Sequence, residues 1–267
     1  MKQSFLIALL SGLRSRVFQS LFAVGALAMG AAFLAGGFSP RQPGTVTLDV
    51  GLSLIRAVSL VLVLYWSYEL VGKEIERRTI YVSLSYPVAR GQFLLGRYLG
   101  ILVLTALAVA LLGSMLAGVV MVSGWGYDQT NPFTLKWPFV LTLLALLLDL
   151  AVVASFGFLV SSVSVTPFVP LVAGLAFAIS ARSLGPALEY LSNMSAGQAQ
   201  LQSTMTPIFD WLRWILPDLS RLDIRYYALY AHQPDAGLLA GSAMMAAGYA
   251  GMLLVLAVWF FNRRQFN

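Results

Sequence analysis

Residues 69–100 read ELVGKEIERRTIYVSLSYPVARGQFLLGRYLG, and this stretch decides how the rest of the chain is organised. It is the densest charged segment of the sequence, and long apolar runs flank it on both sides. Its charged residues are Glu69, Lys73, Glu74, Glu76, Arg77, Arg78, Arg90 and Arg97. Such a segment between two apolar runs is either a plain solvated loop or a stiff element that a partner pushes.

Composition places the chain among integral membrane proteins. Of its 267 residues, 59% are hydrophobic and 10% are charged, whereas a soluble domain carries about 25% charged residues. The absence of cysteine excludes a disulfide framework, a thiolate nucleophile and a cysteine metal site. The single histidine, His232, excludes His-rich metal sites. We therefore predict no catalytic residues and no metal ligands.

The apolar runs predict an all-α integral membrane protein with six transmembrane helices, because each run can cross a hydrocarbon core about 30 Å thick. We expect these spans at about 17–37, 50–71, 93–122, 138–160, 167–181 and 236–261. Residues 1–16 carry one apolar face, which is typical of an N-terminal amphipathic helix in the membrane interface. A signal peptide is the competing interpretation, although Arg14 and Arg16 interrupt its apolar stretch before the first span.

The distribution of Lys and Arg orients the spans. Basic residues of short loops favour the cytoplasmic side of a membrane, whereas those of long loops have little influence. With the N-terminus in the cytoplasm, ten of the 17 basic residues lie inside, and most of the outside ones belong to the long connection at 182–235. Both termini and residues 72–92 are then cytoplasmic. The 182–235 connection lies outside with short amphipathic helices, and it either rests on the membrane or binds a periplasmic partner.

Two charged residues fall inside predicted spans. Asp149 is near the middle of the fourth span and Arg56 is in the first turns of the second. A charge at the bilayer centre costs about 3 kcal/mol on insertion scales. Asp149 is therefore either part of a pathway or a conformational latch, with Arg56 as one candidate partner, or a partly hydrated carboxylate bound by a neighbouring hydroxyl group.

The charged stretch resembles a signature of type-2 ABC exporter permeases, in which paired acidic residues and a Gly-Thr precede an apolar run, a Pro-x-x-Arg and a Leu-Gly-Lys/Arg. The matching residues are Glu74, Glu76, Thr79, Pro87, Arg90, Gly96 and Arg97. Arg78 stands where the family usually has glycine, so we expect the helix there to run one turn further. The segment LPDLSRLDIR at 216–225 is similar to one that many members carry before the last span.

The resemblance implies a permease subunit that works as a dimer, with a second copy or a related permease, and with separate ABC ATPase subunits. No G-x-x-x-x-G-K-[ST] phosphate loop is present in the sequence, so ATP and Mg are expected on the partner and the chain is not expected to be an enzyme. In the family, the loop after the second span forms a coupling helix that docks on the ATPase. The candidates for that contact are Glu74, Glu76, Arg77, Arg78 and Tyr81.

Two other classes of function compete with a permease. An intramembrane protease needs paired aspartates, a Ser–His pair or a zinc motif, and one histidine with one mid-span aspartate does not supply them. For a secondary transporter or channel without an ATPase we would expect more buried ionisable groups and often two repeated halves, and the sequence shows neither. Beyond the ATPase and the second permease, the expected surroundings are lipid of a bacterial inner membrane, with no nucleic-acid partner.

Overall fold

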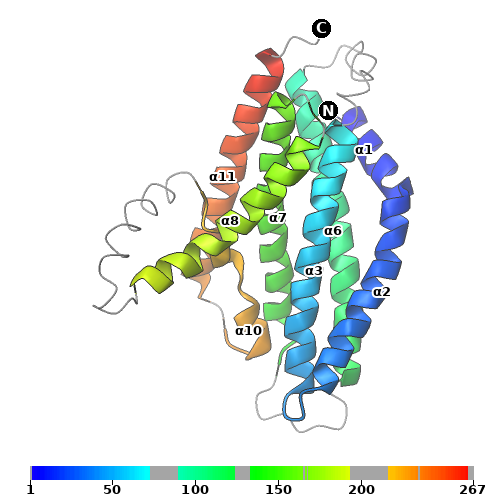
Figure 1. Cartoon of the computed structure of the whole chain (residues 1–267), viewed down its shortest axis with the longest axis vertical. Coiled ribbons are helices and arrows are strands. Elements are labelled where there is room, and N and C mark those ends of the chain that lie inside the picture. The colour runs from blue at the N-terminus through cyan, green and yellow to red at the C-terminus, as the bar shows by residue number, and fades with distance from the viewer. Residues whose placement is uncertain are drawn as a thin grey trace.

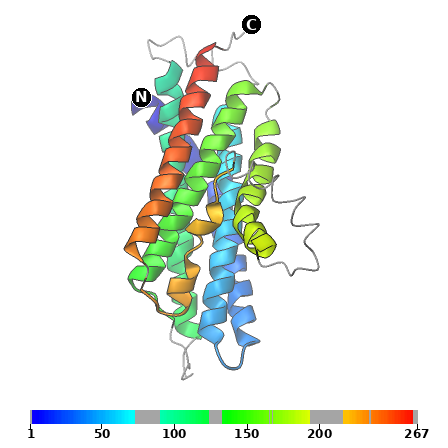
Figure 2. The same cartoon turned by 90° about the vertical axis from the view of Figure 1, so that its left-hand side faces the viewer.

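The computed structural model describes residues 2–72, 90–123, 133–164, 166, 168–192, 216–233 and 235–263. These residues form a bundle of long helices preceded by one short helix (Figures 1 and 2). The elements are α1 (Lys2–Arg14), α2 (Arg16–Gly37), α3 (Pro43–Ser67), the π-helical turn η1 (Tyr68–Gly72), α6 (Arg90–Ser123), α7 (Trp137–Val163), α8 (Val169–Ser192), the 3-10 turn η3 (Leu219–Leu222), α10 (Arg225–Leu229) and α11 (Ala236–Arg263).

Six of the described helices are long and apolar enough to cross a membrane, which confirms the predicted all-α membrane fold. Both ends of the chain lie at the same end of the bundle, near the end of α3 and the start of α6 (Figure 1). An even number of crossings produces this arrangement. The spans generally run a few residues beyond the predicted limits, and α3 in particular begins at Pro43, where proline is compatible with the first helical turn.

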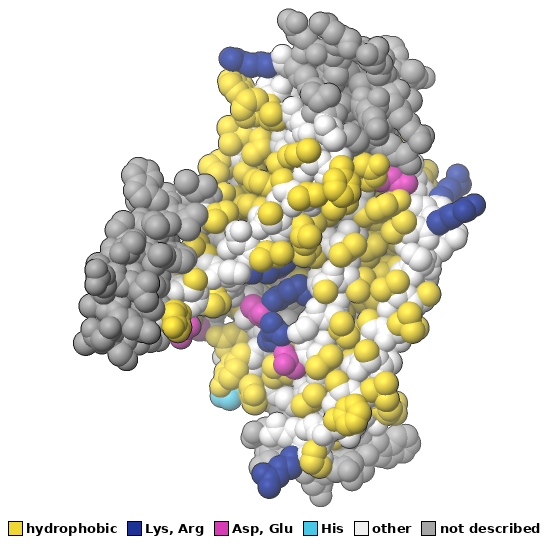
Figure 3. Space-filling model, viewed as in Figure 1, with side chains coloured by type: hydrophobic (Ala, Val, Ile, Leu, Met, Phe, Trp, Pro, Cys, Tyr) yellow, Lys and Arg dark blue, Asp and Glu magenta, His cyan; other side chains and the backbone are white. Residues whose placement is uncertain are grey.

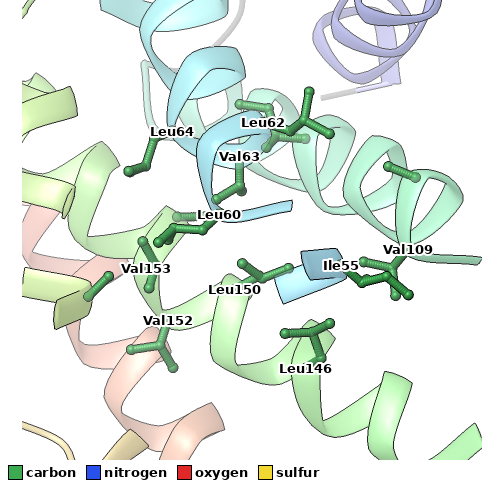
Figure 4. Close-up of a cluster of buried hydrophobic side chains, with 14 of the residues drawn as sticks. Ile55, Leu60, Leu62, Val63, Leu64, Val109, Leu146, Leu150, Val152 and Val153 are labelled. Carbon is green, nitrogen blue, oxygen red and sulfur yellow. The ribbon is translucent and has the colours of Figure 1, made fainter. Parts of the chain in front are cut away.

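α3 is one of the inner helices of the bundle, together with α6 and α7, and it packs against α2, α6, α7 and α8. Figure 4 shows its apolar side chains, including Ile55 and Val63, meeting those of α6 and α7. Ile55 is 1% exposed and Leu150 of α7 is fully buried. A displacement of α3 would therefore be felt by every helix around it, since protein interiors are close-packed.

The short helix α1 is separated from α2 at Ser15, whose side chain accepts a hydrogen bond from the amide of Phe18 at 3.2 Å and caps α2. α1 packs on α6, where Gly100 permits the close approach: a Cβ at Gly100 would lie 2.6 Å from Cβ of Ala8. The other side of α1 leaves Leu6 and Leu10 half exposed. This one-sided burial fits a helix lying along the bundle with an apolar side turned to lipid.

The connection between α8 and α11 differs from the expected outer loop. α8 continues through Pro186 to Ser192, so Arg182 lies inside the helix and not after it. Residues 216–230 are named here the outer segment, after the side on which the sequence predicts them. They fold back onto the bundle and contact α3, α7, α8 and α11 through η3 and α10 (Figure 2). Leu219 and Leu222 are buried in these contacts. The outer segment therefore neither lies flat on the membrane nor stands free for a partner.

Candidate functional site

One face of α3 carries three polar residues at helical spacing. Asp49, Ser53 and Arg56 are separated by four and three residues, which aligns them along one side of the helix. They face the outer segment. Arg56 Nη1 donates to Asp223 Oδ2 at 2.5 Å, and Arg225 Nη1 donates to Asp49 Oδ1 at 3.0 Å and to Ser53 Oγ at 2.7 Å. Polar pairs therefore join α3 to a segment more than 150 residues further along the chain.

Asp223 is the shared acceptor of this group. Arg225 binds it through Nε and Nη2, the latter at 2.7 Å, and Arg56 binds it from α3. Burial raises the pKa of the Asp223 carboxyl, but the hydrogen bonds and charges of Arg225 and Arg56 outweigh burial and lower the pKa to about 2. The carboxylate stays ionised at neutral pH. Its hydrogen bonds also raise the pKa of Arg225.

A second ion pair connects α7 and α8. Arg182 donates to Asp149 Oδ2 from Nε at 3.1 Å and from Nη2 at 2.6 Å. Asp149 is 2% exposed, and its other carboxylate oxygen, Oδ1, has no hydrogen-bond partner among the described residues. Arg56 and Asp223 are close enough to Asp149 to act on its charge. A buried carboxylate that uses one of its two oxygens can still accept a further donor.

Together these residues form an alternating series of two neighbouring ion-paired groups, Asp49–Arg225–Asp223–Arg56 and Asp149–Arg182, named here the ion-pair chain. Three arginines balance three aspartates, so the series is neutral. Figure 3 shows acidic and basic side chains gathered in a hollow at the centre of one face of the molecule, with apolar side chains around them.

The depth of the ion-pair chain is unusual for charged groups. Arg56, Asp149 and Arg182 lie near the middle of α3, α7 and α8, respectively. Arg56 and Asp223 each keep 22% of the side chain exposed, and Arg182 keeps 18%. Partly exposed charges at this depth are costly against lipid and are found facing a bundle interior or a water-filled space. The face that carries them is therefore unsuited to lipid contact.

Two hollows flank the outer segment. One, of about 520 Å³, lies between α8, the outer segment and α11 and includes Gly185 and Tyr249 in its lining. The other, of about 650 Å³, lies between the outer segment and the start of α11 and includes Tyr226 and Gly241. The outer segment therefore borders a hollow on two sides, while its Leu219, Leu222 and Ala228 are buried against the bundle.

Asp149 and Arg56, singled out from the sequence, both belong to the ion-pair chain, but they are not paired with each other. Asp149 binds Arg182 and Arg56 binds Asp223. Arg56 was one candidate partner of Asp149, and the actual partners were missed because the sequence assigned Arg182 to the outer loop and did not indicate that Asp223 folds back to the bundle. The sequence feature that could have indicated these partners is the pair of charged residues Asp223 and Arg225 in LDIR at 222–225. A role in a pathway or latch stays a prediction.

The predicted coupling residues Glu74, Glu76, Arg77, Arg78 and Tyr81 lie outside the described residues, as does the prediction of a longer helix at Arg78. The structure describes the elements on either side of this segment. α3 ends in the π-helical turn η1 at Gly72, and α6 starts at Arg90. Within the described part of the chain, no group of three or more His, Cys, Asp or Glu residues could hold a metal ion.

A family model for the ABC-2 family transporter protein matches residues 9–266. The chain belongs to the ABC-2 transporter family. This match confirms the resemblance seen in residues 69–100 and 216–225 and identifies a multi-pass membrane component of an ABC transporter. A search of curated proteins finds no match. In this ABC-2 protein the segment that resembles the family before the last span, 216–225, is the one that supplies Asp223 and Arg225 to the ion-pair chain.

Proposed function

We propose that this ABC-2 protein is the permease subunit of an ATP-driven transporter of the bacterial inner membrane, with both termini in the cytoplasm. Separate ATPase subunits bind ATP and Mg²⁺ and supply the energy, and a second permease copy, or a related permease, completes the complex. The family match over residues 9–266 carries the proposal. The sequence has no phosphate loop of its own, which agrees with an energy source on another chain.

The force exerted by the ATPase subunits would be transmitted through α3. Residues 72–92 follow α3 directly, so a push on Glu74, Glu76, Arg77, Arg78 or Tyr81 by an ATPase would be transmitted along this helix. α3 contacts the four long helices α2, α6, α7 and α8 and carries three polar residues bound to the outer segment. A cytoplasmic event would then change contacts on the outer side, as alternating access requires.

The transport pathway would follow the face that carries the ion-pair chain. Arg56, Arg182 and Asp223 are partly exposed there, near the middle of the spanning helices, and water or protein satisfies such groups far better than lipid does. A pathway between two permease copies would supply both. Residues 193–215 lie outside the described residues, and contact of the outer connection with the membrane surface or a periplasmic partner stays a prediction.

Co-purification tests the proposal. An affinity-tagged chain, extracted gently from native membranes, is expected to bring down an ATPase subunit that contains a phosphate loop. Arg77→Glu/Arg78→Glu should abolish this association while the permease still folds. The matched control is Arg41→Glu/Lys136→Glu, which makes the same charge change at the opposite end of the bundle and should leave the association intact. Transport by this chain with no ATPase would favour a secondary transporter or channel and refute the proposal.

A further inference from the structure

The ion-pair chain connects two groups of elements. α3 and α7 carry Asp49, Arg56 and Asp149, whereas α8 and the outer segment carry Arg225, Asp223 and Arg182. The signs read negative, positive, negative on one side and positive, negative, positive on the other. Every residue of one group binds a residue of the other. Such complementarity fixes one register between the two surfaces, because like charges meet if one surface shifts.

Each group is also held together internally. α3 and α7 share the apolar cluster of Figure 4, to which Ile55 and Leu150 belong. α8 and the outer segment meet closely at Gly185, where a Cβ would lie 3.2 Å from Cβ of Ser220. The contact between the groups changes along α8. Before Arg182, the rings of Phe177 and of Phe156 in α7 stack with their centroids 4.2 Å apart. At Arg182 the described polar contact of α8 to α7 is the ion pair with Asp149.

We propose that the outer half of α8 and the outer segment form one hinged unit, an outer gate that Arg56, Arg225 and Asp149 hold closed against α3 and α7. The gate pivots near the Phe156–Phe177 stack. Ion pairs suit a contact that opens to water, since the attraction gained on closing is offset by lost hydration and the separated groups are hydrated again. This inference rests on the proposed transport function but concerns the permease chain itself.

The open state has its own pairing. When the gate moves away from α3 and α7, the ion pairs Arg56–Asp223 and Asp149–Arg182 are broken. The cation Arg56 on α3 and the anion Asp149 on α7 then need new partners. Asp149 Oδ1, which has no partner among the described residues, is then the acceptor for Arg56. On the gate, Asp223 keeps Arg225, to which it is already bound at 2.7 Å. Arg56 is thus a positioning residue that exchanges one carboxylate for another.

Cysteine accessibility tests the gate, and the cysteine-free sequence needs no prior engineering. Ala228→Cys places a reporter at a fully buried position of the outer segment, and His232→Cys, at an exposed position beyond it, gives the rate of full labelling. The full chain in right-side-out vesicles is treated with a membrane-impermeant thiol reagent. Adding Arg56→Gln should raise labelling of the reporter about ten- to hundredfold, because a hydrogen bond to a charged group is lost.

Two controls separate the gate from general loosening. Arg56→Lys keeps a cation and should raise labelling less than Arg56→Gln. Arg221→Gln removes a cation from the same segment, but Arg221 is 67% exposed and pairs with Asp218 beyond the ion-pair chain, so labelling should stay at the background rate. Equal rates for Arg56→Gln and the parent, or equal rates for Arg56→Gln and Arg221→Gln, would overturn the proposal.

A disulfide distinguishes a hinged unit from a segment that detaches alone. Gly185→Cys/Ser220→Cys brings two Cβ atoms to 3.2 Å, close to the value of about 3.8 Å in disulfides. Once oxidised, it joins the outer segment to α8. If both move together, Arg56→Gln still exposes the Ala228→Cys reporter. If the disulfide returns labelling to background, the segment leaves α8 and the hinged unit is wrong. Because no ATPase takes part, this outcome is independent of the co-purification result.

Discussion

Replacing Asp223 by asparagine should weaken the ion pairs that hold the outer segment in place. Asp223 accepts hydrogen bonds from Arg56 and Arg225, and their combined effect lowers its pKa from 3.8 to about 2 against the opposing effect of burial. A carboxyl with such a shift stabilises the folded state by roughly 2 kcal/mol at neutral pH. Asp223→Asn should therefore lower the midpoint of thermal unfolding by about 4–8 °C.

The pH dependence of this effect has a definite sign. Because the pKa of Asp223 is lower in the folded protein, its contribution is complete above about pH 4 and is lost as the pH falls toward 2. Roughly half should remain at pH 3. The assay is thermal unfolding of the parent and of Asp223→Asn in detergent at pH 7, 5, 4 and 3, and the gap between them should narrow across the two lowest values.

The matched control for Asp223→Asn is Arg221→Gln, which removes a charge from the same segment at an exposed pair. Exposed ion pairs are worth about 0–1 kcal/mol, so its midpoint should barely change. The reasoning is refuted if the two variants unfold at the same temperature at pH 7. It is also refuted if the gap between the parent and Asp223→Asn is constant from pH 7 to pH 3.

Two further predictions concern helix contacts. Gly100→Ala should destabilise the protein by about 1–3 kcal/mol, because the new methyl group would lie 2.6 Å from Cβ of Ala8; Gly118→Ala, on the same helix with no neighbour within 4 Å, should be neutral or stabilising by up to about 1 kcal/mol in the same thermal assay. Asp149→Asn should cost about 3–5 kcal/mol by leaving Arg182 without its carboxylate, and adding Arg182→Gln should recover part of this loss, whereas additive losses would contradict the pairing.

The helices could be predicted from the sequence because the membrane imposes one simple requirement. A backbone in hydrocarbon must satisfy its own hydrogen bonds, so every long apolar run is a helix. The limits of α8 were less predictable. The sequence predicted an end of the fifth span at 181 and short separate helices after it, yet α8 continues through Pro186 to Ser192, because neighbouring protein can compensate for a proline inside a helix.

The ion-pair chain was predictable only in part. Asp149 and Arg56 stood out because charges in apolar runs are rare and need partners. Their partners come from Arg182 and from the outer segment, which is distant in sequence from α3. A hydrophobicity pattern carries no information on which loop folds back between helices. The alternation of charges across two surfaces becomes visible only when both are placed side by side.

ATP hydrolysis on a partner is proposed to move this permease, and Ser53→Cys measures that movement directly. Ser53 lies on the polar face of α3 and binds Arg225 of the outer segment; Leu27→Cys, at a similar distance from the outer end of α2 and 76% exposed, is the lipid-facing control. In the complex with its ATPase, labelling of Ser53→Cys by an impermeant reagent should differ between the nucleotide-free and ATP-trapped states, while Leu27→Cys stays unlabelled in both. A rate at Ser53→Cys that is the same with and without ATP would contradict the account.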